Sequence, residues 1–127
     1  MSDYTITNLD DIEDSASGRG LGFGSARFPR EAVGAQRTGF AHITLLPHKQ
    51  QPFGHRHEEA EEIYFVIAGS GEIKLDDGIH ELRARDIVRL APTVTRALRG
   101  GPDGMEVIVF GARHAGDGEM IQGYWEQ

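Results

Sequence analysis

The sequence predicts an all-β domain of short antiparallel strands, folded as a sandwich or a barrel. From residue 37 onward, apolar and polar residues alternate with a period of two, which is the pattern of strands. The candidate strands recur at intervals of about eight to twelve residues, with Gly or Pro between them. No segment has the pattern of a long helix. A barrel or sandwich satisfies all three observations.

The composition limits the classes of function. A chain of 127 residues is most simply one domain, and 39% apolar and 26% charged residues are ordinary for a globular protein. The absence of cysteine excludes disulfides, zinc fingers, iron–sulfur clusters and thiol catalysis. A formal charge of −7 argues against nucleic-acid binding. No apolar run reaches membrane-spanning length and no signal peptide is recognisable at the start, so we expect no membrane association and a cytoplasmic location.

The single domain divides into an N-terminal arm (1–36), a barrel core (37–111) and a short C-terminal tail (112–127). In the arm, residues 4–9 alternate and predict a short strand, whereas residues 10–26 are acidic and then rich in Gly and Ser, which predicts a loop. The glycines of this loop do not have the GxGxxG spacing of a nucleotide-binding loop. In the tail, the adjacent aromatics Tyr124 and Trp125 are expected to cover a sheet edge of this chain or of a partner.

The core strands follow in order from the pattern. Residues 37–47 form the first strand, which Pro47 ends, and residues 62–69 form an apolar strand that we expect to be buried on both faces. Residues 71–82 predict a hairpin in which Asp77-Gly78 supplies the positive φ angles of a tight turn. Residues 86–92, 93–99 and 105–112 are the remaining candidate strands, separated by Pro92 and by the turn segment GGPDG.

The stretch FGHRHEEAEEIYFVIAGSG, residues 53–71, carries the most chemistry. On a strand, His55 and His57 project from one face, and two converging imidazoles form half of a site for a divalent metal. A carboxylate at the mouth of the next strand, Glu61 or Glu62, would complete the site. The alternative is a solvated acidic turn that happens to contain histidines, and spacing alone leaves both interpretations open.

The same stretch resembles the first motif of the cupin superfamily, which runs His-x-His, three or four residues, Glu, six residues, Gly. His55, His57, Glu62 and Gly69 match this pattern with intervals of four and six residues. The match selects Glu62 over Glu61. The resemblance covers about residues 37–111 and implies an antiparallel jelly-roll β-barrel with a small-molecule site inside it.

The second cupin motif is present only in part. Arg85-Asp86 stands where the family has Gly-Asp, Pro92-Thr93 replaces Pro-x-Gly in part, and Arg96 occupies the position of the expected histidine. The resemblance implies a metal site of three histidines and one glutamate, and this chain would lack one histidine. Arginine cannot replace it as a ligand because it stays protonated and has no lone pair to give.

Two arrangements then remain. In one, His55, His57 and Glu62 hold a divalent Fe, Mn, Ni or Zn ion, and Arg96 clamps an anionic substrate beside open coordination positions. In the other, Arg96 pairs with Glu62 in a metal-free ligand pocket. The two are nearly balanced, with a slight preference for a weak or facultative metal.

Other residues complete the expected pocket. Tyr64 shares a face with Glu62 and would line it. His42 lies among apolar residues of the first strand, where it would be either a third nitrogen or, as the favoured interpretation, a buried or interface histidine. His48, His80 and His114 are expected at exposed positions.

These residues predict a small-molecule-binding protein. One hypothesis is a metal-dependent enzyme of the oxygenase or isomerase type that acts on a small anionic substrate. Another is a non-catalytic, metal-free binding or sensing module, and a third is a structural domain with a residual pocket. The resemblance and the available arm and tail also predict a homodimer.

Overall fold

The computed structural model describes residues 3–112 and 116–127. Within these ranges the chain forms eight strands and three very short helical segments. The strands are β1 (Gly24–Arg27), β2 (Thr38–Leu45), β3 (Phe53–His57), β4 (Glu62–Leu75), β5 (Gly78–Arg83), β6 (Ile87–Leu90), β7 (Ala97–Ala112) and β8 (Gly118–Gln122). The helical segments are η1 (Leu9–Asp11), α1 (Ser15–Gly18) and η2 (Tyr124–Glu126).

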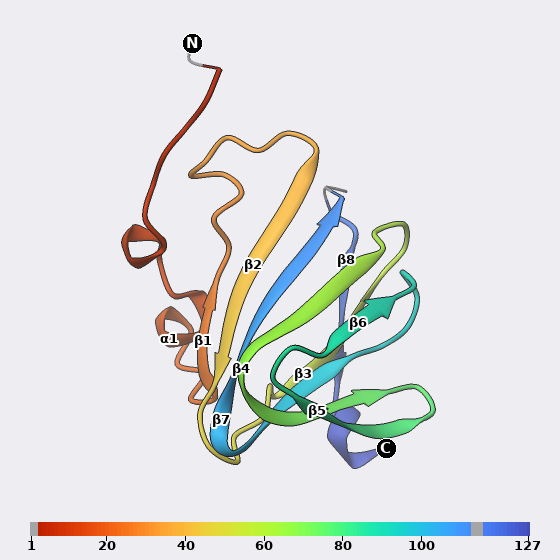
Figure 1. Ribbon diagram of the computed structural model, residues 1–127. Helices are drawn as coiled ribbons and strands as arrows, with labels where there is room; N and C mark the ends of the chain where they lie inside the picture. Colours follow the sequence, from red (N-terminus) through yellow and green to blue (C-terminus); the bar gives the residue numbers. More distant parts are fainter. Residues whose placement is uncertain (1–2, 113–115) are drawn as a thin grey trace.

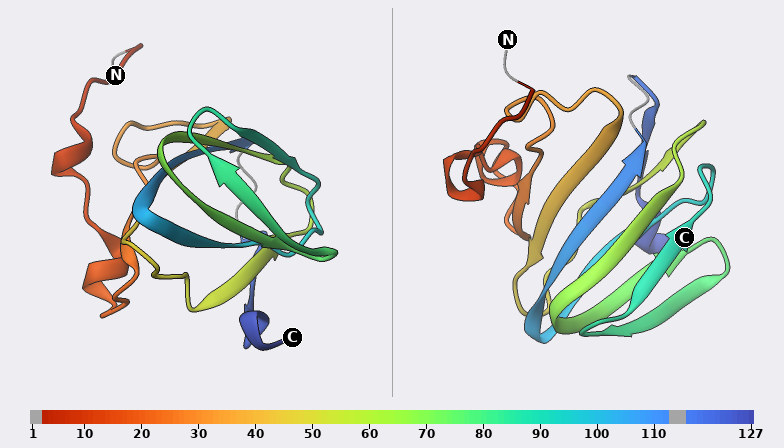
Figure 2. Two further views of the ribbon diagram at one scale, coloured as in Figure 1. Left: turned by 60° about the horizontal axis from the view of Figure 1, so that its bottom comes forward. Right: turned by 45° about the horizontal axis from the view of Figure 1, so that its top comes forward.

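The strands form two antiparallel sheets. The larger sheet has the order β1-β2-β7-β4-β5, with β6 paired to the first part of β4, and the smaller one contains β3 and β8. Figure 1 shows β3 and β8 behind the larger sheet, and Figure 2 shows the strands curving around a common interior. The predicted antiparallel all-β fold is therefore confirmed.

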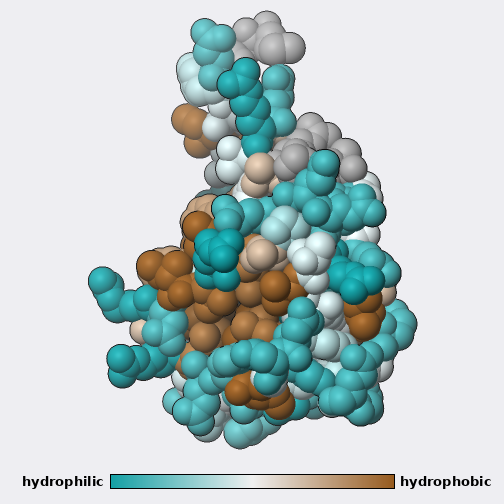
Figure 3. All heavy atoms as spheres, turned by 90° about the vertical axis from the view of Figure 1, so that its right-hand side faces the viewer, coloured by the Kyte–Doolittle hydropathy of each residue, from teal (hydrophilic) through white to brown (hydrophobic). Residues whose placement is uncertain are grey.

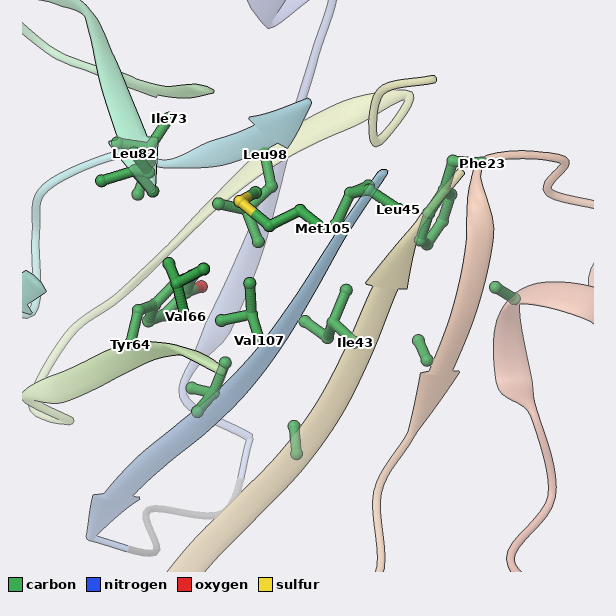
Figure 4. Close-up of a cluster of buried hydrophobic side chains, with 14 of the residues drawn as sticks. Phe23, Ile43, Leu45, Tyr64, Val66, Ile73, Leu82, Leu98, Met105 and Val107 are labelled. Carbon is green, nitrogen blue, oxygen red and sulfur yellow. The ribbon is translucent and has the colours of Figure 1, made fainter. Parts of the chain in front are cut away.

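Strand register determines which side chains face the interior. Ala41 of β2, Val109 of β7 and Tyr64 of β4 lie in one row across the larger sheet, and their side chains are buried. Ile43, Val107 and Val66 form the next buried row, and Figure 4 shows these side chains in one hydrophobic cluster with Tyr64, Leu45 and Met105. Alternate residues of the same strands consequently face outward.

The outward face of β4 differs from the prediction. Ile63 is 40% exposed, so the expectation that this strand is buried on both faces is wrong. On neighbouring strands Phe110 is 41% exposed and Ile87 is 68% exposed. The reason is that the smaller sheet lies on only one side of the larger one. Figure 3, which views the side of the molecule on which β6 lies in Figure 1, shows a patch of hydrophobic side chains rimmed by hydrophilic ones.

Two glycines allow the long central strands to bend together. Gly69 in β4 has a φ of 76°, and a Cβ atom there would lie 2.2 Å from the backbone oxygen of Gly104. Gly104 in β7 has a φ of 77°, and the register between β4 and β7 shifts next to this point. A single strand, β7, runs through the break that was predicted between two strands and covers all of residues 97–112, whereas residues 93–95 are not strand.

The predicted hairpin is present with a shifted turn. Leu75 pairs with Gly78, so the two turn residues are Asp76 and Asp77 rather than Asp77 and Gly78. Only Gly78 has a positive φ, of 139°.

The arm is more ordered than predicted. Residues 10–26 were expected to be a loop, but they include α1 and most of β1, and residues 4–9 do not form the expected strand. The carboxylate of Asp14 explains the order, because it accepts hydrogen bonds from the backbone N–H groups of Ala16 and Ser17 at the start of α1 and of Ala26 in β1. β1 then pairs with β2 at the edge of the larger sheet.

The tail closes one end of the molecule. β8 pairs with β3, and Tyr124 packs against Gly54 with its hydroxyl donating to the backbone oxygen of Thr95. The indole of Trp125 donates to the oxygen of Gln51. The two aromatics thus cover strands of their own chain. None of the helical segments in the described ranges is long and apolar enough to span a membrane.

Candidate functional site

Strand β3 presents the two histidines of the site on one face, as predicted from their spacing. Their rings lie edge to face with centroids 5.3 Å apart, while Arg56 points to the other side and pairs with Glu119 of β8 at 3.0 Å. β3 has a backbone partner along both edges. On one edge it pairs with β8, and on the other His55 and Arg96 exchange two backbone hydrogen bonds of 3.0 Å. This double pairing fixes the directions of both imidazoles.

Glu62, the first residue of β4, supplies the carboxylate. Its Oε1 atom lies 3.2 Å from Nε2 of His57 and 3.7 Å from Nε2 of His55, and its side chain is 16% exposed. Glu61 instead points outward and pairs with Arg89 at 2.9 Å. The structure therefore brings together the predicted trio and distinguishes the two glutamates as the cupin pattern does.

The orientation of these atoms suits a cation. Nε2 of His57 and Oε1 of Glu62 are buried and close together, yet neither forms a hydrogen bond with another described residue. One ligand atom from each of His55, His57 and Glu62 lies within 4.8 Å of the others. Three lone-pair-bearing groups that approach one another without hydrogen bonding fit a shared metal ion.

The electrostatic state of Glu62 is consistent with this fit. Burial acts to raise the pKa of its carboxyl, but the contacts with His55 and His57 outweigh burial and lower the pKa to about 2. Glu62 is therefore ionised, as a ligand must be, across the neutral and mildly acidic range.

Arg96 lies behind the trio rather than in the cavity. Its side chain is 0% exposed, and its Nη1 group donates to the backbone oxygens of Val94 at 2.6 Å and Pro92 at 3.2 Å. Nη2 lies 3.5 Å from Oε1 of Glu62 without a hydrogen bond, and Nε also has no hydrogen-bond partner among the described residues. The buried guanidinium is thus a positive charge next to Glu62.

Tyr64 lies beside the trio, as predicted. Its hydroxyl is 3.5 Å from Nε2 of His55, and the residue is almost fully buried. Burial, together with the negative charge of Glu62, raises the pKa of the Tyr64 hydroxyl far above its ordinary value, although Arg96 acts in the opposite direction. The hydroxyl therefore stays protonated.

Asp117 is a site residue that the sequence interpretation missed. Its carboxylate accepts hydrogen bonds from the backbone N–H groups of Glu58, Glu59 and Ala60, the turn between the two histidines and Glu62. Its Oδ2 atom also lies 3.5 Å from Nδ1 of His57. Burial acts to raise the pKa of Asp117, but these three N–H groups and His57 lower it. Asp117 is more than 50 residues away along the chain, and nothing in its Gly-rich surroundings indicates this role.

His42 does not reach the site. It lies on the outward face of β2, between Ala41 and Ile43, which face inward, and its Nε2 atom is 2.6 Å from Oε2 of Glu106. This placement agrees with the favoured interpretation of a buried histidine and removes His42 from the pocket. His48 and His80 are exposed, as expected, while His114 lies outside the described residues.

The trio opens onto two adjoining hollows. One has a volume of about 440 Å³ and the other about 370 Å³, and His57, Glu62, Phe28, Ala41 and Val109 contribute to both. His55 and Tyr64 line the smaller hollow, whereas Arg96 lines neither. Both volumes are in the range of pockets for small molecules.

Comparison with known proteins agrees with the resemblance. The family model described as the Cupin domain matches residues 41–110, which is more than half of the chain. Among solved structures, a cupin protein from Bacteroides fragilis is similar at 20% identity and a TM-score of 0.73, covering 91% of this chain and 89% of its own. No curated protein matches the sequence.

Two further solved structures carry a stated activity. A sugar phosphate isomerase of the cupin superfamily from Silicibacter pomeroyi is 17% identical, with a TM-score of 0.71 and coverage of 94% of this chain and 93% of its own. The polyketide cyclase RemF from Streptomyces resistomycificus is 16% identical, with a TM-score of 0.73 and coverage of 93% and 84%. At these identities the likeness concerns the fold alone. The family match, the fold and the His55–His57–Glu62 arrangement together show that the chain belongs to the cupins.

Proposed function

We propose that this cupin binds a small anionic molecule in its interior and holds a divalent metal ion with His55, His57 and Glu62. The observation that carries the proposal is the approach of three lone-pair-bearing groups, two of them buried without a hydrogen bond. When bound, a divalent ion at such a site would supply Lewis-acid polarisation of a substrate oxygen. A two-histidine, one-carboxylate set leaves coordination positions open for a ligand, which suits iron, manganese, nickel or zinc.

The protein's own groups would orient the ligand and restrict water. Tyr64 keeps its proton and is a donor beside His55, and Asp117 steadies the turn that carries the chain from His57 to Glu62. Buried apolar side chains such as Ala41 and Val109 limit the water around the trio. These features support an enzyme of the isomerase or oxygenase type, and two proteins of similar fold are an isomerase and a cyclase.

Elemental analysis of protein purified without chelators tests the metal. We expect that His57→Ala removes most of the bound divalent ion and that His48→Ala, at an exposed turn on another part of the surface, retains it. Equal metal content in the two variants would place the ion elsewhere and refute the proposed centre.

A specific observation favours a second candidate, a metal-free binding module. Arg96 places a buried positive charge 3.5 Å from Oε1 of Glu62, where it provides part of the charge balance that a metal would provide. In this arrangement His55 and His57 become hydrogen-bonding groups for the ligand. Retention of ligand binding by metal-free protein, with no metal recovered on purification, would favour this candidate over the first.

We also propose a two-fold homodimer through the outward face of the larger sheet. The aromatic tail is engaged by its own chain, so the support comes instead from Ile63, Ile87 and Phe110, which leave apolar area exposed side by side on paired strands. The expected result is a dimer mass by light scattering that Ile87→Glu converts to a monomer mass. A monomeric wild-type protein at micromolar concentration would refute this assembly.

A further inference from the structure

The two hollows differ in a way that indicates the chemistry of the ligand. The smaller hollow is lined largely by apolar and aromatic side chains, including Leu21, Phe23, Phe53 and Ile43. The larger hollow is also lined by His57 and Glu62, and its lining includes Arg30 and the neighbouring Glu31. A molecule that spans both would therefore meet an apolar chamber, the trio and Arg30, while Arg19 in the wall of the smaller hollow is exposed.

Arg30 is available to a ligand. It lies in the turn at residues 29–35, where the amide of Val33 donates to the oxygen of Pro29 and the amide of Ala35 to that of Arg30 itself. Its Nε atom is buried and forms no hydrogen bond with a described residue. Its one described ion pair is with Glu31, at 4.0 Å, and the Glu31 side chain is 87% exposed. A pair of that length at that exposure contributes little, so the guanidinium is not held by a protein carboxylate.

We propose that the ligand class is a small monocarboxylate with an apolar or aromatic body, whose carboxylate is bound by Arg30 and whose body occupies the chamber lined by Phe23, Phe28 and Phe53. This inference rests on the proposed small-molecule site and extends it by naming the ligand. It also replaces Arg96, which lines neither hollow, by Arg30 as the anion-binding residue. A guanidinium is suited to this role because its planar fork matches a carboxylate.

The size of the hollows restricts the ligand further. Each hollow has a volume of a few hundred cubic ångströms, which admits a molecule of roughly the size of one ring with a short chain. The aromatic walls favour an aryl or alkyl body over a polyhydroxylated one, because an apolar wall cannot satisfy hydroxyl groups that lose their water. The inference therefore disfavours sugar phosphates, although their isomerase shares the fold.

The test uses calorimetric titration of the full chain with four probes: phenylacetate, hexanoate, acetate and the neutral analogue phenylacetamide. We expect phenylacetate or hexanoate to bind at least tenfold more tightly than both acetate and phenylacetamide. Arg30→Gln should lower the affinity for the carboxylate by about tenfold, the size of one charge-assisted hydrogen bond, and leave phenylacetamide unchanged. Arg30→Lys should retain part of the affinity, and Phe28→Ala should weaken carboxylate and amide alike.

A matched control and a metal titration separate the possible failures. Arg89→Gln removes an exposed arginine that pairs with Glu61 away from the hollows and should change nothing. Any one of three results would overturn the inference. These are equal affinity for phenylacetate and phenylacetamide, no change of carboxylate affinity in an Arg30→Gln variant with a normal melting curve, and no binding of either phenylacetate or hexanoate. Titration with manganese, both without and with phenylacetate present, reports on the metal centre. If the carboxylate binds through Arg30 and manganese binds under neither condition, the metal centre is refuted and the inference is supported. If manganese binds and the carboxylate does not, the inference alone is refuted.

Discussion

Replacing Arg96 with histidine tests how this site differs from the cupin pattern. The arginine is fully buried, donates to two backbone oxygens and lies 3.5 Å from Glu62. Histidine at this position would remove a permanent positive charge beside the trio and add a nitrogen that can coordinate. The backbone of residue 96 stays paired with His55 in either case, because that pairing does not involve the side chain.

If the trio binds a divalent ion, Arg96→His should tighten the binding. A fourth ligand adds one coordination bond, and loss of the guanidinium removes a repulsion between like charges. We expect at least a tenfold gain in metal affinity, which is about 1.4 kcal/mol. Ligand binding through Arg30 should remain, since Arg30 lies on the cavity side and Arg96 does not.

If the site is metal-free, the same substitution should destabilise the apo protein. Removing one member of a buried ion pair costs about 3–5 kcal/mol. The lower end applies here, because Glu62 keeps its contacts with two imidazoles and is 16% exposed. The oxygens of Pro92 and Val94 would also lose a donor. The melting temperature should fall, and an added divalent ion should restore it.

Calorimetric metal titration and melting curves, each with and without metal, distinguish these outcomes. Arg89→His serves as the control, because Arg89 is exposed and far less constrained. If Arg96→His changes neither metal affinity nor melting temperature, the guanidinium does not interact electrostatically with the trio, and Arg96 does not determine the charge of the site.

Three further predictions concern the metal affinity of the site and the stability of the fold. Asp117→Ala should lower the metal affinity, measured by titration, about tenfold or more, and Asp117→Asn should lower it less. The reason is that the carboxylate holds both the turn after His57 and the imidazole itself. Equal metal affinity in the wild type and both variants would contradict this role. Gly69→Ala should lower the free energy of unfolding by more than 1 kcal/mol in a denaturant titration, because the left-handed backbone and a contact of 2.2 Å with the backbone oxygen of Gly104 both oppose a Cβ atom. An unchanged denaturation midpoint would show that a Cβ atom is tolerated at this position. Asp14, whose pKa is lowered by three backbone N–H groups despite burial, contributes stability that is present above its ordinary pKa near 3.8 and is lost as pH falls below it. The melting temperatures of the wild type and of Asp14→Ala should therefore converge in acid. A constant difference would argue against stabilisation by the hydrogen bonds that the Asp14 carboxylate accepts at the start of α1.

The sequence predicted the parts of the molecule that local periodicity determines. Alternation located β2, β4 and β6, and the spacing of His55, His57 and Glu62 identified the trio, because residues two apart on a strand share a face. The alternation of residues along β2 does not indicate which face is inward, because that depends on the register with β7. The sequence alone therefore did not place His42 inside or outside the pocket. Likewise, the turn after β4 moved by one residue because pairing with β5, not the Asp-Gly dipeptide, sets it.

Other site residues were hidden for a different reason. Asp117 and Arg30 belong to segments outside the predicted strands, and they reach the trio or its cavity only through long-range pairing of the tail with β3 and of the arm with β2. Arg96 was located by its place in the second motif, but the motif cannot tell whether a longer side chain enters the cavity or turns behind the ligands. Its contacts with Pro92 and Val94 decide that it turns behind.

The charges around the trio indicate why an anionic ligand suits this site. With neutral imidazoles, the negative charge of Glu62 and the positive charge of Arg96 cancel, so the apo site is balanced without a metal. A divalent ion would then add two uncompensated positive charges to a partly buried region, where a pair of like unit charges 4 Å apart repels by about 4 kcal/mol. An anion in the cavity would offset that repulsion, and Arg30, which lines the larger hollow, would attract the anion even without metal. Metal and carboxylate should consequently bind cooperatively, each raising the affinity for the other by the same factor. If the trio holds a metal, Arg96 in place of the expected histidine should therefore make the metal affinity higher with the carboxylate bound than without it.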